Sequence, residues 1–390
     1  MTKTKAYTVL SILFFIVDSS VASTFFNVVN LGAKPDGESD STQSFVKAWD
    51  GACGSVTSAI IYVPLGRYLI KNVEFKGPCK STNITFRIDG SLVAPPDYNV
   101  IGNLENWISF QWVNGVSIYG GTLDGRGIAL WACKLANKKC PSGATTLSFT
   151  NSKDIVINGL KSFNSQMFHI VINGCENVSM QKLMITASGN SPNTDGIHVQ
   201  LSTGVTIMRS GIKTGDDCIS IGPGTRNLWI EHVACGPGHG ISIGSLAKDL
   251  DEPGVQNVTI KTVVFTGTQN GMRIKAWGRP SNGFVKGILF QHAIMKNVQN
   301  PLVIDQNYCP HNDSCPGQVS GIKISEVSYE DIRGTSATQV AVKFDCSTKN
   351  PCKQIKLENV KLTYQNQPAV SSCTNADGFV HGVVEPAGCF

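Results

Sequence analysis

Three aspartates and one histidine in the middle of the chain are spaced so that they can meet at one site. Asp195, Asp217 and His239 follow one another at intervals of 22 residues, and Asp216 directly precedes Asp217. Carboxylates that lie close together repel one another, which raises the pKa of at least one of them. A protonated carboxyl beside an ionised one is the acid and base pairing that hydrolysis of a glycosidic bond requires.

Two other interpretations of these aspartates are weaker. An isolated Asp often bonds its own backbone at a turn, but three carboxylates in a register that also holds a histidine favour a chemical role. Clustered aspartates also bind calcium. The calcium-loop pattern with its terminal Glu is missing from this segment, however, and histidine is a poor calcium ligand. The spacing therefore favours proton transfer over metal binding.

Short strands are the elements that must position these side chains. The 22-residue register stacks two apolar columns with a polar column between them. The apolar columns are Ile197, Ile219 and Ile241, and Val199, Ile221 and Ile243; the polar column is His198, Ser220 and Ser242. Coils stacked at the strand spacing of about 4.8 Å bring the aspartates and the histidine onto one patch. Strict alternation would point Asp217 and His239 inward, but glycines at 215, 238 and 240 indicate a backbone bend before each strand.

The same strand pattern recurs along most of the chain. Triplets with apolar first and third residues repeat every 23 to 39 residues and begin at Val116, Ile155, Val178, Val205, Leu228, Val258, Ile288, Ile322 and Ile355. A propeller blade needs four strands with hairpin turns, and leucine-rich repeats have their own consensus; neither pattern is found here. Coils that carry two or three short strands are typical of a parallel β-helix, an all-β solenoid.

A basic pair lies downstream of the aspartates. In the segment 271–277, Met272, Ile274 and Ala276 are expected to point inward, so Arg273 and Lys275 point outward beside the carboxylates. Two cations there suit a substrate carboxylate, which Arg can bind through two parallel hydrogen bonds. They can also pair with the aspartates themselves, and both roles are compatible in an empty site.

The N-terminal residues are typical of a secretory signal peptide. Lys3 and Lys5 precede an apolar run from Val9 to Val17, and small residues follow at 21–23. We therefore expect residues 1–23 to be removed and 24–390 to form one secreted β-helix domain. Four sequons predict N-glycosylation, at Asn83, Asn177, Asn257 and Asn312.

Thirteen cysteines agree with an oxidising compartment. None of the close pairs has the C-x-x-C spacing of a zinc site, so local disulfides are expected. The expected pairs are Cys133 with Cys140, Cys309 with Cys315, Cys346 with Cys352, and Cys373 with Cys389. Cys218 with Cys235 and Cys53 with Cys79 are two further possible pairs, which leaves Cys175 as the candidate for a buried free thiol.

The composition excludes several classes of protein. The chain is 41% hydrophobic with a net charge of only +5, which is incompatible with a disordered protein. No run reaches the ~20 apolar residues of a membrane span. Basic residues interleaved with aromatics, as in nucleic-acid sites, are not found. Four of the histidines outside the aspartate column are expected to be structural or surface residues: His169, His198, His232 and His311.

Four segments, in order, resemble the signature segments of the polygalacturonases, a family of glycoside hydrolases. They are Asn193-Thr194-Asp195, Gly215-Asp216-Asp217, Gly238-His239-Gly240 and Arg273-Ile274-Lys275. The resemblance runs from Asn27–Ala33 to Cys373 and Cys389, and within the family it is greatest to plant pollen-type exopolygalacturonases.

This resemblance implies a right-handed β-helix that hydrolyses α-1,4 bonds of polygalacturonate with inversion, needs no cofactor or metal, and acts in the plant cell wall. It implies Asp216 as the general acid, Asp195 and Asp217 as the residues that activate water, and His239 as the residue that sets protonation of the acid. Arg273 and Lys275 would bind galacturonate carboxylates. Asn193 and Tyr308 match positions near the substrate.

Other activities remain open at this stage. An exo-acting monomer that releases galacturonic acid from pectin is favoured over an endo-acting polygalacturonase, because the resemblance is greatest to exo-acting members. A rhamnogalacturonan hydrolase or a pectate lyase would share the fold, and a lyase would need calcium. A non-catalytic wall-binding β-helix is the least favoured, since all three aspartates are present.

Overall fold

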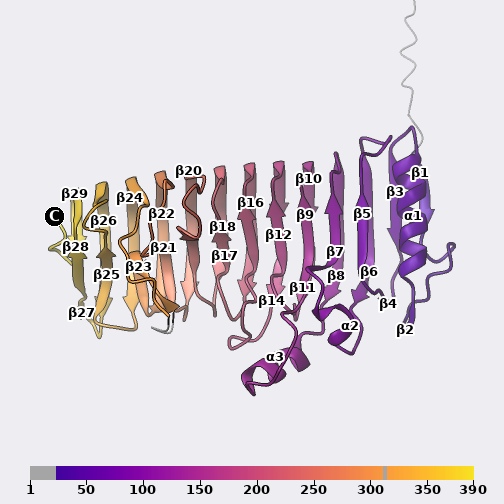
Figure 1. The fold of residues 1–390 in the computed structure, drawn as a ribbon, viewed down its shortest axis with the longest axis horizontal. Helices are drawn as coiled ribbons and strands as arrows, with labels where there is room; N and C mark the ends of the chain where they lie inside the picture. The colour runs from indigo at the N-terminus through magenta and orange to yellow at the C-terminus, as the bar shows by residue number, and fades with distance from the viewer. Residues whose placement is uncertain (1–22, 311–313) are drawn as a thin grey trace, which may run out of the picture.

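The computed structural model describes residues 23–310 and 314–390. The predicted signal peptide and the Asn312 sequon therefore lie outside the described residues, apart from Ser23. Parallel strands stack side by side into an elongated body whose axis follows the chain from α1 to the C-terminus (Figure 1). This is the predicted right-handed parallel β-helix.

An eleven-stranded parallel sheet forms one face of the body. Its strands are β5 (Val73–Lys76), β7 (Asn106–Gln111), β9 (Thr145–Thr150), β12 (Ile170–Asn173), β15 (Ile197–Gln200), β17 (Ile219–Ile221), β19 (Ile241–Leu246), β21 (Asn270–Trp277), β23 (Asn300–Tyr308), β25 (Val340–Asp345) and β28 (Val370–Thr374).

An eighteen-stranded sheet forms the rest of the wall. Its strands are β1 (Thr24–Asn27), β2 (Asp36–Asp40), β3 (Ala59–Val63), β4 (Arg67–Leu69), β6 (Ile84–Val93), β8 (Val116–Asp124), β10 (Lys153–Asn158), β11 (Lys161–Phe163), β13 (Glu176–Gln181), β14 (Met184–Thr186), β16 (Thr203–Lys213), β18 (Arg226–Cys235), β20 (Val255–Thr266), β22 (Phe284–Val298), β24 (Lys323–Ser336), β26 (Cys352–Tyr364), β27 (Gln367–Pro368) and β29 (Ala376–Glu385). Only β26 and β27 pair antiparallel among the described strands.

The core consists of inward columns that continue from coil to coil. Ile197 pairs with Ile219, which pairs with Ile241, as the 22-residue register predicts. All three side chains are completely buried. Alternating strand residues point to opposite faces, so these apolar stacks fill the solenoid while the residues between them face outward. Burying a side chain of this size contributes roughly 2 kcal/mol each to folding.

One predicted repeat is out of register. The predicted triplet 322–324, at the start of β24, does not stack in the column of the other triplets, because Ile288 pairs with Val327 and Val327 pairs with Ile355. Both segments alternate apolar and polar residues, and a period of two cannot distinguish one from the other. The stacking triplet is therefore 327–329 rather than 322–324.

Three helices, which the repeat does not predict, accompany the coils: α1 (Thr42–Gly54), α2 (Asn99–Gly102) and α3 (Ile128–Leu135). Helix α1 covers the N-terminal end of the stack, while α2 and α3 project from one side (Figure 1). Phe45 and Trp49 of α1 are buried, and the indole of Trp49 packs against Phe75 and Phe86. The helix thereby shields the first coil from water.

Six disulfides join the cysteines in the pairs considered from the sequence, and Cys175 is free and buried. The sequon residues Asn83, Asn177 and Asn257 are exposed, and their glycosylation stays a prediction. Within the described ranges, no helix has the length and apolar character needed to cross a bilayer.

Candidate active site

The predicted site residues lie at the turns that lead into the eleven-stranded sheet. Asp195, Asp217 and His239 each stand two residues before the inward isoleucine that starts β15, β17 or β19. Backbone bonds hold these turns together: the Gly196 amide donates to the Asp217 carbonyl at 2.9 Å, and the His239 amide donates to the Asp216 carbonyl at 2.7 Å. Neighbouring turns are therefore fixed by the same ladder as the strands.

Glycine permits the bend that turns these side chains out of the core. Gly240 has φ +90, and a Cβ atom there would lie 2.1 Å from the Asn270 carbonyl oxygen. Any larger residue would push the next coil away. At Gly215 a Cβ atom would lie 2.1 Å from the Ser191 carbonyl oxygen. The predicted break in alternation thus depends on close backbone contact between coils.

Asp217 is the electrostatic centre of the site. Its side chain is 1% exposed, and each carboxylate oxygen accepts a hydrogen bond from a cation. Arg273 Nη2 donates to Oδ1 and Lys275 Nζ donates to Oδ2, both at 2.8 Å. Ser242 Oγ also donates to Oδ1 at 2.8 Å, and it accepts from Arg273 Nε at 2.9 Å. The two cations therefore pair with Asp217, as the sequence analysis allowed.

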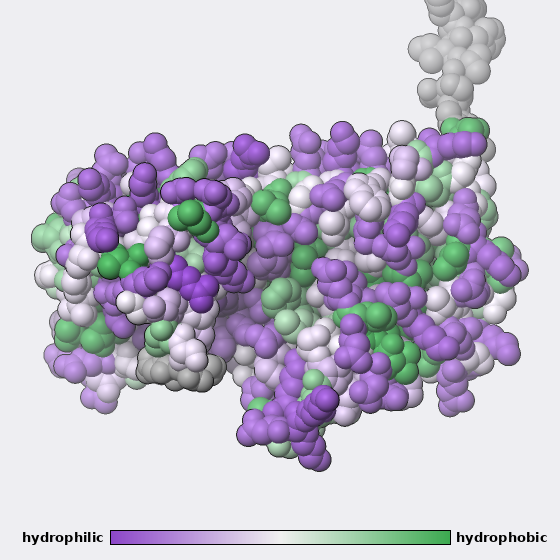
Figure 2. Space-filling model, viewed as in Figure 1, coloured by the Kyte–Doolittle hydropathy of each residue, from purple (hydrophilic) through white to green (hydrophobic). Residues whose placement is uncertain are grey.

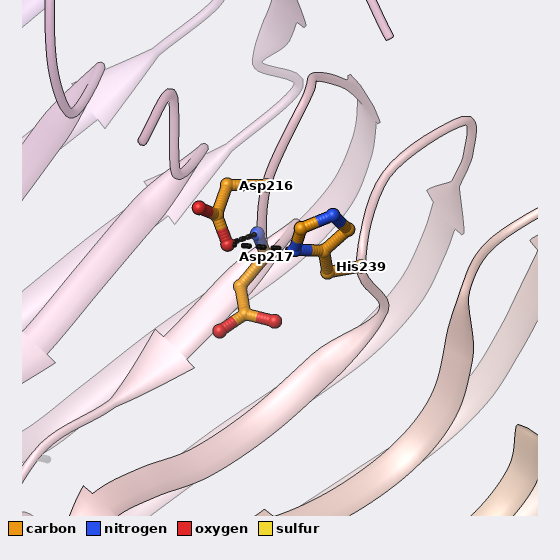
Figure 3. A group of neighbouring side chains, drawn as sticks. All are labelled: Asp216, Asp217 and His239. Carbon is orange, nitrogen blue, oxygen red and sulfur yellow. Dashed lines mark hydrogen bonds and ion pairs between the residues drawn. The ribbon is translucent and has the colours of Figure 1, made fainter. Parts of the chain in front are cut away.

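Asp216 points in another direction from its neighbour. Its Oδ1 lies 3.0 Å from His239 Nδ1 and accepts the Asp217 amide at 2.8 Å. Figure 3 shows the Asp216 carboxylate and the His239 ring turned toward each other, with the Asp217 carboxylate pointing away from both. The Asp216 and His239 side chains are 19% and 36% exposed, so solvent and substrate can reach this pair.

The buried aspartates have opposite protonation behaviour. Burial, together with the negative charges of Asp216 and Asp217, raises the pKa of Asp195 well above its usual value. Burial alone would also raise the pKa of Asp217, but Lys275 and Arg273 more than offset it and lower that pKa to about 2. Burial thus favours the protonated form of Asp195, while the two cations favour the ionised form of Asp217.

Tyr308 and Asn193 complete the predicted set. The Tyr308 ring centroid lies 5.3 Å from Lys275 Nζ and 5.9 Å from the Arg273 guanidinium carbon, so its face is next to both cations. Trp277 packs edge-to-face on Tyr308 at 5.2 Å. Asn193 is exposed, with a left-handed backbone at φ 54, two residues before Asp195.

One residue has a larger role than the sequence indicated. Ser242 stood in the predicted polar column, but only the structure shows that it is buried and bridges Asp217 to Arg273. His198 lies in the same outward column, and its contacts are those of a structural residue, as expected. Its Nδ1 is 2.8 Å from Ser220 Oγ, and its ring stacks on Phe168. Burial lowers the pKa of His198.

The other histidines divide as follows. His169 is completely buried, and its Nδ1 lies 2.8 Å from Ser162 Oγ. His232 is exposed and lies beside Glu231, which is consistent with a surface role. His311 lies outside the described residues.

Asp216, Asp217 and His239 each offer a ligand atom, and these atoms lie within 4.8 Å of one another. Their chemistry fits proton transfer better than metal binding. Both oxygens of Asp217 already accept bonds from cations, and two adjacent positive groups would repel a metal ion. His239 Nδ1 faces a carboxylate oxygen rather than an open position.

Comparison with known proteins extends these observations. Residues 53–387 match the model for glycosyl hydrolases family 28. The polygalacturonase of Prunus persica is 65% identical over 383 residues, which cover 97% of this chain and 98% of the relative. The exopolygalacturonase of Platanus acerifolia is 42% identical over 371 residues, covering 94% and 98%.

A solved structure, the polygalacturonase from Erwinia carotovora ssp. carotovora, superposes with a TM-score of 0.71 at 24% identity. The match covers 94% of this chain and 98% of that one. At this identity the likeness establishes the fold.

Proposed function

The chain belongs to glycosyl hydrolases family 28, and on that premise we propose that it is a polygalacturonase that hydrolyses the α-1,4 bonds of polygalacturonate with inversion. The observation that carries the proposal is the placement of Arg273 and Lys275 within 2.8 Å of Asp217, beside the Asp216–His239 pair. Hydrolytic carboxyl groups and cations for an acidic sugar thus occupy one site.

Asp216 is proposed as the general acid. Its carboxyl is the catalytic one that remains accessible from the cleft, and His239 Nδ1 contacts it at 3.0 Å. A proton held between this pair can pass to the oxygen of the leaving sugar as the bond breaks. His239 acts by setting the protonation of Asp216.

Asp195 and Asp217 are proposed to activate the water. Asp217 is ionised and can accept a proton, while Asp195 retains one and can bond the same water. Because these groups interact strongly, their protons belong to the pair rather than to either residue alone. Attack from the face opposite the leaving group gives inversion.

A galacturonate carboxylate would compete with Asp217 for its cations. Arg273 and Lys275 hold the Asp217 pKa at about 2, which makes it a weak base. A substrate carboxylate that binds the same cations weakens their hold on Asp217, so its pKa rises and it becomes a better base. Binding of an acidic sugar would therefore activate the water.

Exo action and secretion are the finer parts of the proposal. Support for exo action comes from the relative named exopolygalacturonase, which matches over nearly its full length. Six disulfides favour an oxidising compartment, and the named relatives are plant proteins, which supports action in the cell wall.

The test is digestion of polygalacturonate with purified protein while viscosity, reducing ends and ultraviolet absorption are followed together. We expect reducing ends to rise with release of galacturonic acid, at nearly constant viscosity and without unsaturated products. An early fall in viscosity would mean endo action. Ultraviolet-absorbing products would identify a lyase, and activity on the rhamnogalacturonan backbone alone would replace the proposed substrate.

A further inference from the structure

A second hollow lies on the catalytic face, toward the N-terminal end. Its volume is about 460 Å³, and its walls come from loop residues 103–105, 142–145 and 167–168, with Val171 of β12 between them. On the face shown in Figure 2, hydrophobic side chains gather beside the lobe that carries α3.

This hollow, the distal pocket, is continuous with the catalytic residues. Val171 pairs with His198 and His198 pairs with Ser220 in one outward column. Phe168, from the wall of the pocket, stacks on the His198 ring at 5.3 Å. Two coil steps separate Val171 from Ser220, or about 10 Å along the axis. A polymer that follows this face from the catalytic aspartates therefore reaches the distal pocket.

The lining of the distal pocket does not suit a carboxylate. Leu104, Met167, Phe168 and Val171 supply apolar surface, and Glu105 is the one charged residue among the nine that line it. A free galacturonate carboxylate placed there would lose water without gaining a cation, and it would face the negative charge of Glu105. At the catalytic residues, in contrast, Arg273 and Lys275 place two cations beside Asp217, where a substrate carboxylate can reach them.

Lys134 of α3 is the cation in contact with the pocket wall. Its Nζ donates to the Ser142 carbonyl at 2.7 Å, and burial lowers the pKa of this amine. The ammonium is thus directed at the backbone of the loop rather than being one of the lining groups. If Lys134 bound a substrate carboxylate, removing its charge would weaken binding of the free acid. If the pocket binds an ester, the same change should leave binding of the free acid unaltered.

We propose that the distal pocket binds a galacturonosyl residue whose carboxyl group is methyl-esterified. The inference rests on the proposed polygalacturonase function and names which part of pectin this site accepts. An ester carries no charge to oppose Glu105, and its methyl group can be buried against Phe168 and Leu104. The enzyme therefore tolerates an ester on the sugar residue that occupies the distal pocket. The Arg273–Lys275 site would reject the same ester.

The experiment uses galacturonate oligomers of one length, each with a single methyl ester at a different position. We expect one position at which the ester lowers KM relative to the free acid, by up to about fourfold, the value of one buried methyl group. Esters at the residue bound by Arg273 and Lys275 should raise KM. Arg in place of Leu104, which is 41% exposed, should reverse the preference at the one tolerant position by about fivefold.

Leu65→Arg is the matched control, since it adds the same charge at an exposed leucine in the loop between β3 and β4. Met167→Lys provides a second cation from another wall of the pocket. Both pocket variants should change the preference between ester and free acid at the same position of the oligomer. The control should change this preference at no position.

Three outcomes would overturn the proposal. An ester could raise the KM of the wild type at every position of the oligomer. Lys134→Gln could weaken binding of the free acid at the tolerant position, which would make the pocket a carboxylate site. An oligomer with a neutral branch sugar could bind there better than the ester. Failure to cleave even the free-acid oligomer would instead contradict the proposed function.

Discussion

The two ends of the catalytic face stand on the same column of the β-helix but differ in chemistry. At one end, Ser242 and Arg273 belong to a buried ionic network around Asp217. At the other, Val171 and the neighbouring Phe168 line an apolar hollow. The inward stacks below them are alike, with isoleucine in each coil. Inward residues thus maintain the coil, and outward residues determine which group of the substrate each coil meets.

The largest expected effect is at the charged end. Asp216→Asn removes the proton that the leaving oxygen needs and leaves the backbone unchanged, so turnover of polygalacturonate should fall about 1,000-fold, as expected for loss of a general acid. Circular dichroism and binding of polygalacturonate should be unchanged. Retention of a tenth of the wild-type rate would exclude Asp216 as the acid.

Lys275→Met should be the next largest change. The variant loses a cation for the substrate and a partner of Asp217, so kcat/KM should fall about 100-fold. Lys153→Met removes a similar charge from an exposed site on the eighteen-stranded sheet, away from this face, and is the control. If KM stays constant and only the acid limb of the pH–rate profile moves, Lys275 serves Asp217 and not the substrate.

Asp217 should also give the protein an acid-sensitive stability. Its pKa in the folded state, about 2, is lower than the value of 3.8 for a free side chain. The stabilisation is therefore present above pH 3.8 and is lost as pH falls through 2, and it amounts to about 2 kcal/mol. Urea unfolding of wild type and Asp217→Asn at several pH values should show their difference shrinking on acidification. A constant difference would contradict the buried ion pairs.

Asp195 should have the opposite effect. Because its pKa is raised in the folded state, the unfolded chain releases the proton more readily, and stability is lost as pH rises above 3.8. Asp195→Asn should therefore stabilise the protein at pH 7 by about 1 kcal/mol, while activity is lost. Its advantage should disappear at low pH, and Asp50→Asn, at an exposed site, should show no such trend. Thermal melting at two pH values measures both.

The smallest effect should come from the apolar end. Val171→Thr changes the floor of the distal pocket without adding charge, so kcat/KM on free-acid polygalacturonate should stay within about twofold of wild type. A larger loss would mean that this end also contributes to binding of the free acid, and the contrast between the two ends would be weaker than the structure indicates.

The charged end was accessible to sequence analysis because its residues lie in one short register. Asp195, Asp217 and His239 repeat at one interval, and Arg273 and Lys275 alternate with apolar residues. The protonation states were not accessible in the same way. That Asp195 has the raised pKa and Asp217 the lowered one depends on burial and on which carboxylate the two cations face.

The apolar end could not be found from a repeat. Leu104, Gly143 and Phe168 belong to separate loops that no periodic pattern connects, and they meet only when the coils stack. The contact between His198 and Phe168 likewise crosses between coils, so no periodic pattern indicates it. The triplet at 322–324 was chosen in place of 327–329 because both alternate apolar and polar residues and follow each other closely. Loop geometry and register both depend on contacts between distant parts of the sequence.

The regular coil spacing also fixes the separation between the two ends. Val171 and Ser220 lie two steps apart, and each step is about 4.8 Å whatever residues face outward. The distance from the scissile bond to a tolerated ester is therefore a number of coils, and the pattern of esters along pectin would determine where the enzyme can cut. Adding one designed coil between β12 and β15 should move the tolerated ester along the oligomer without altering the chemistry of cleavage.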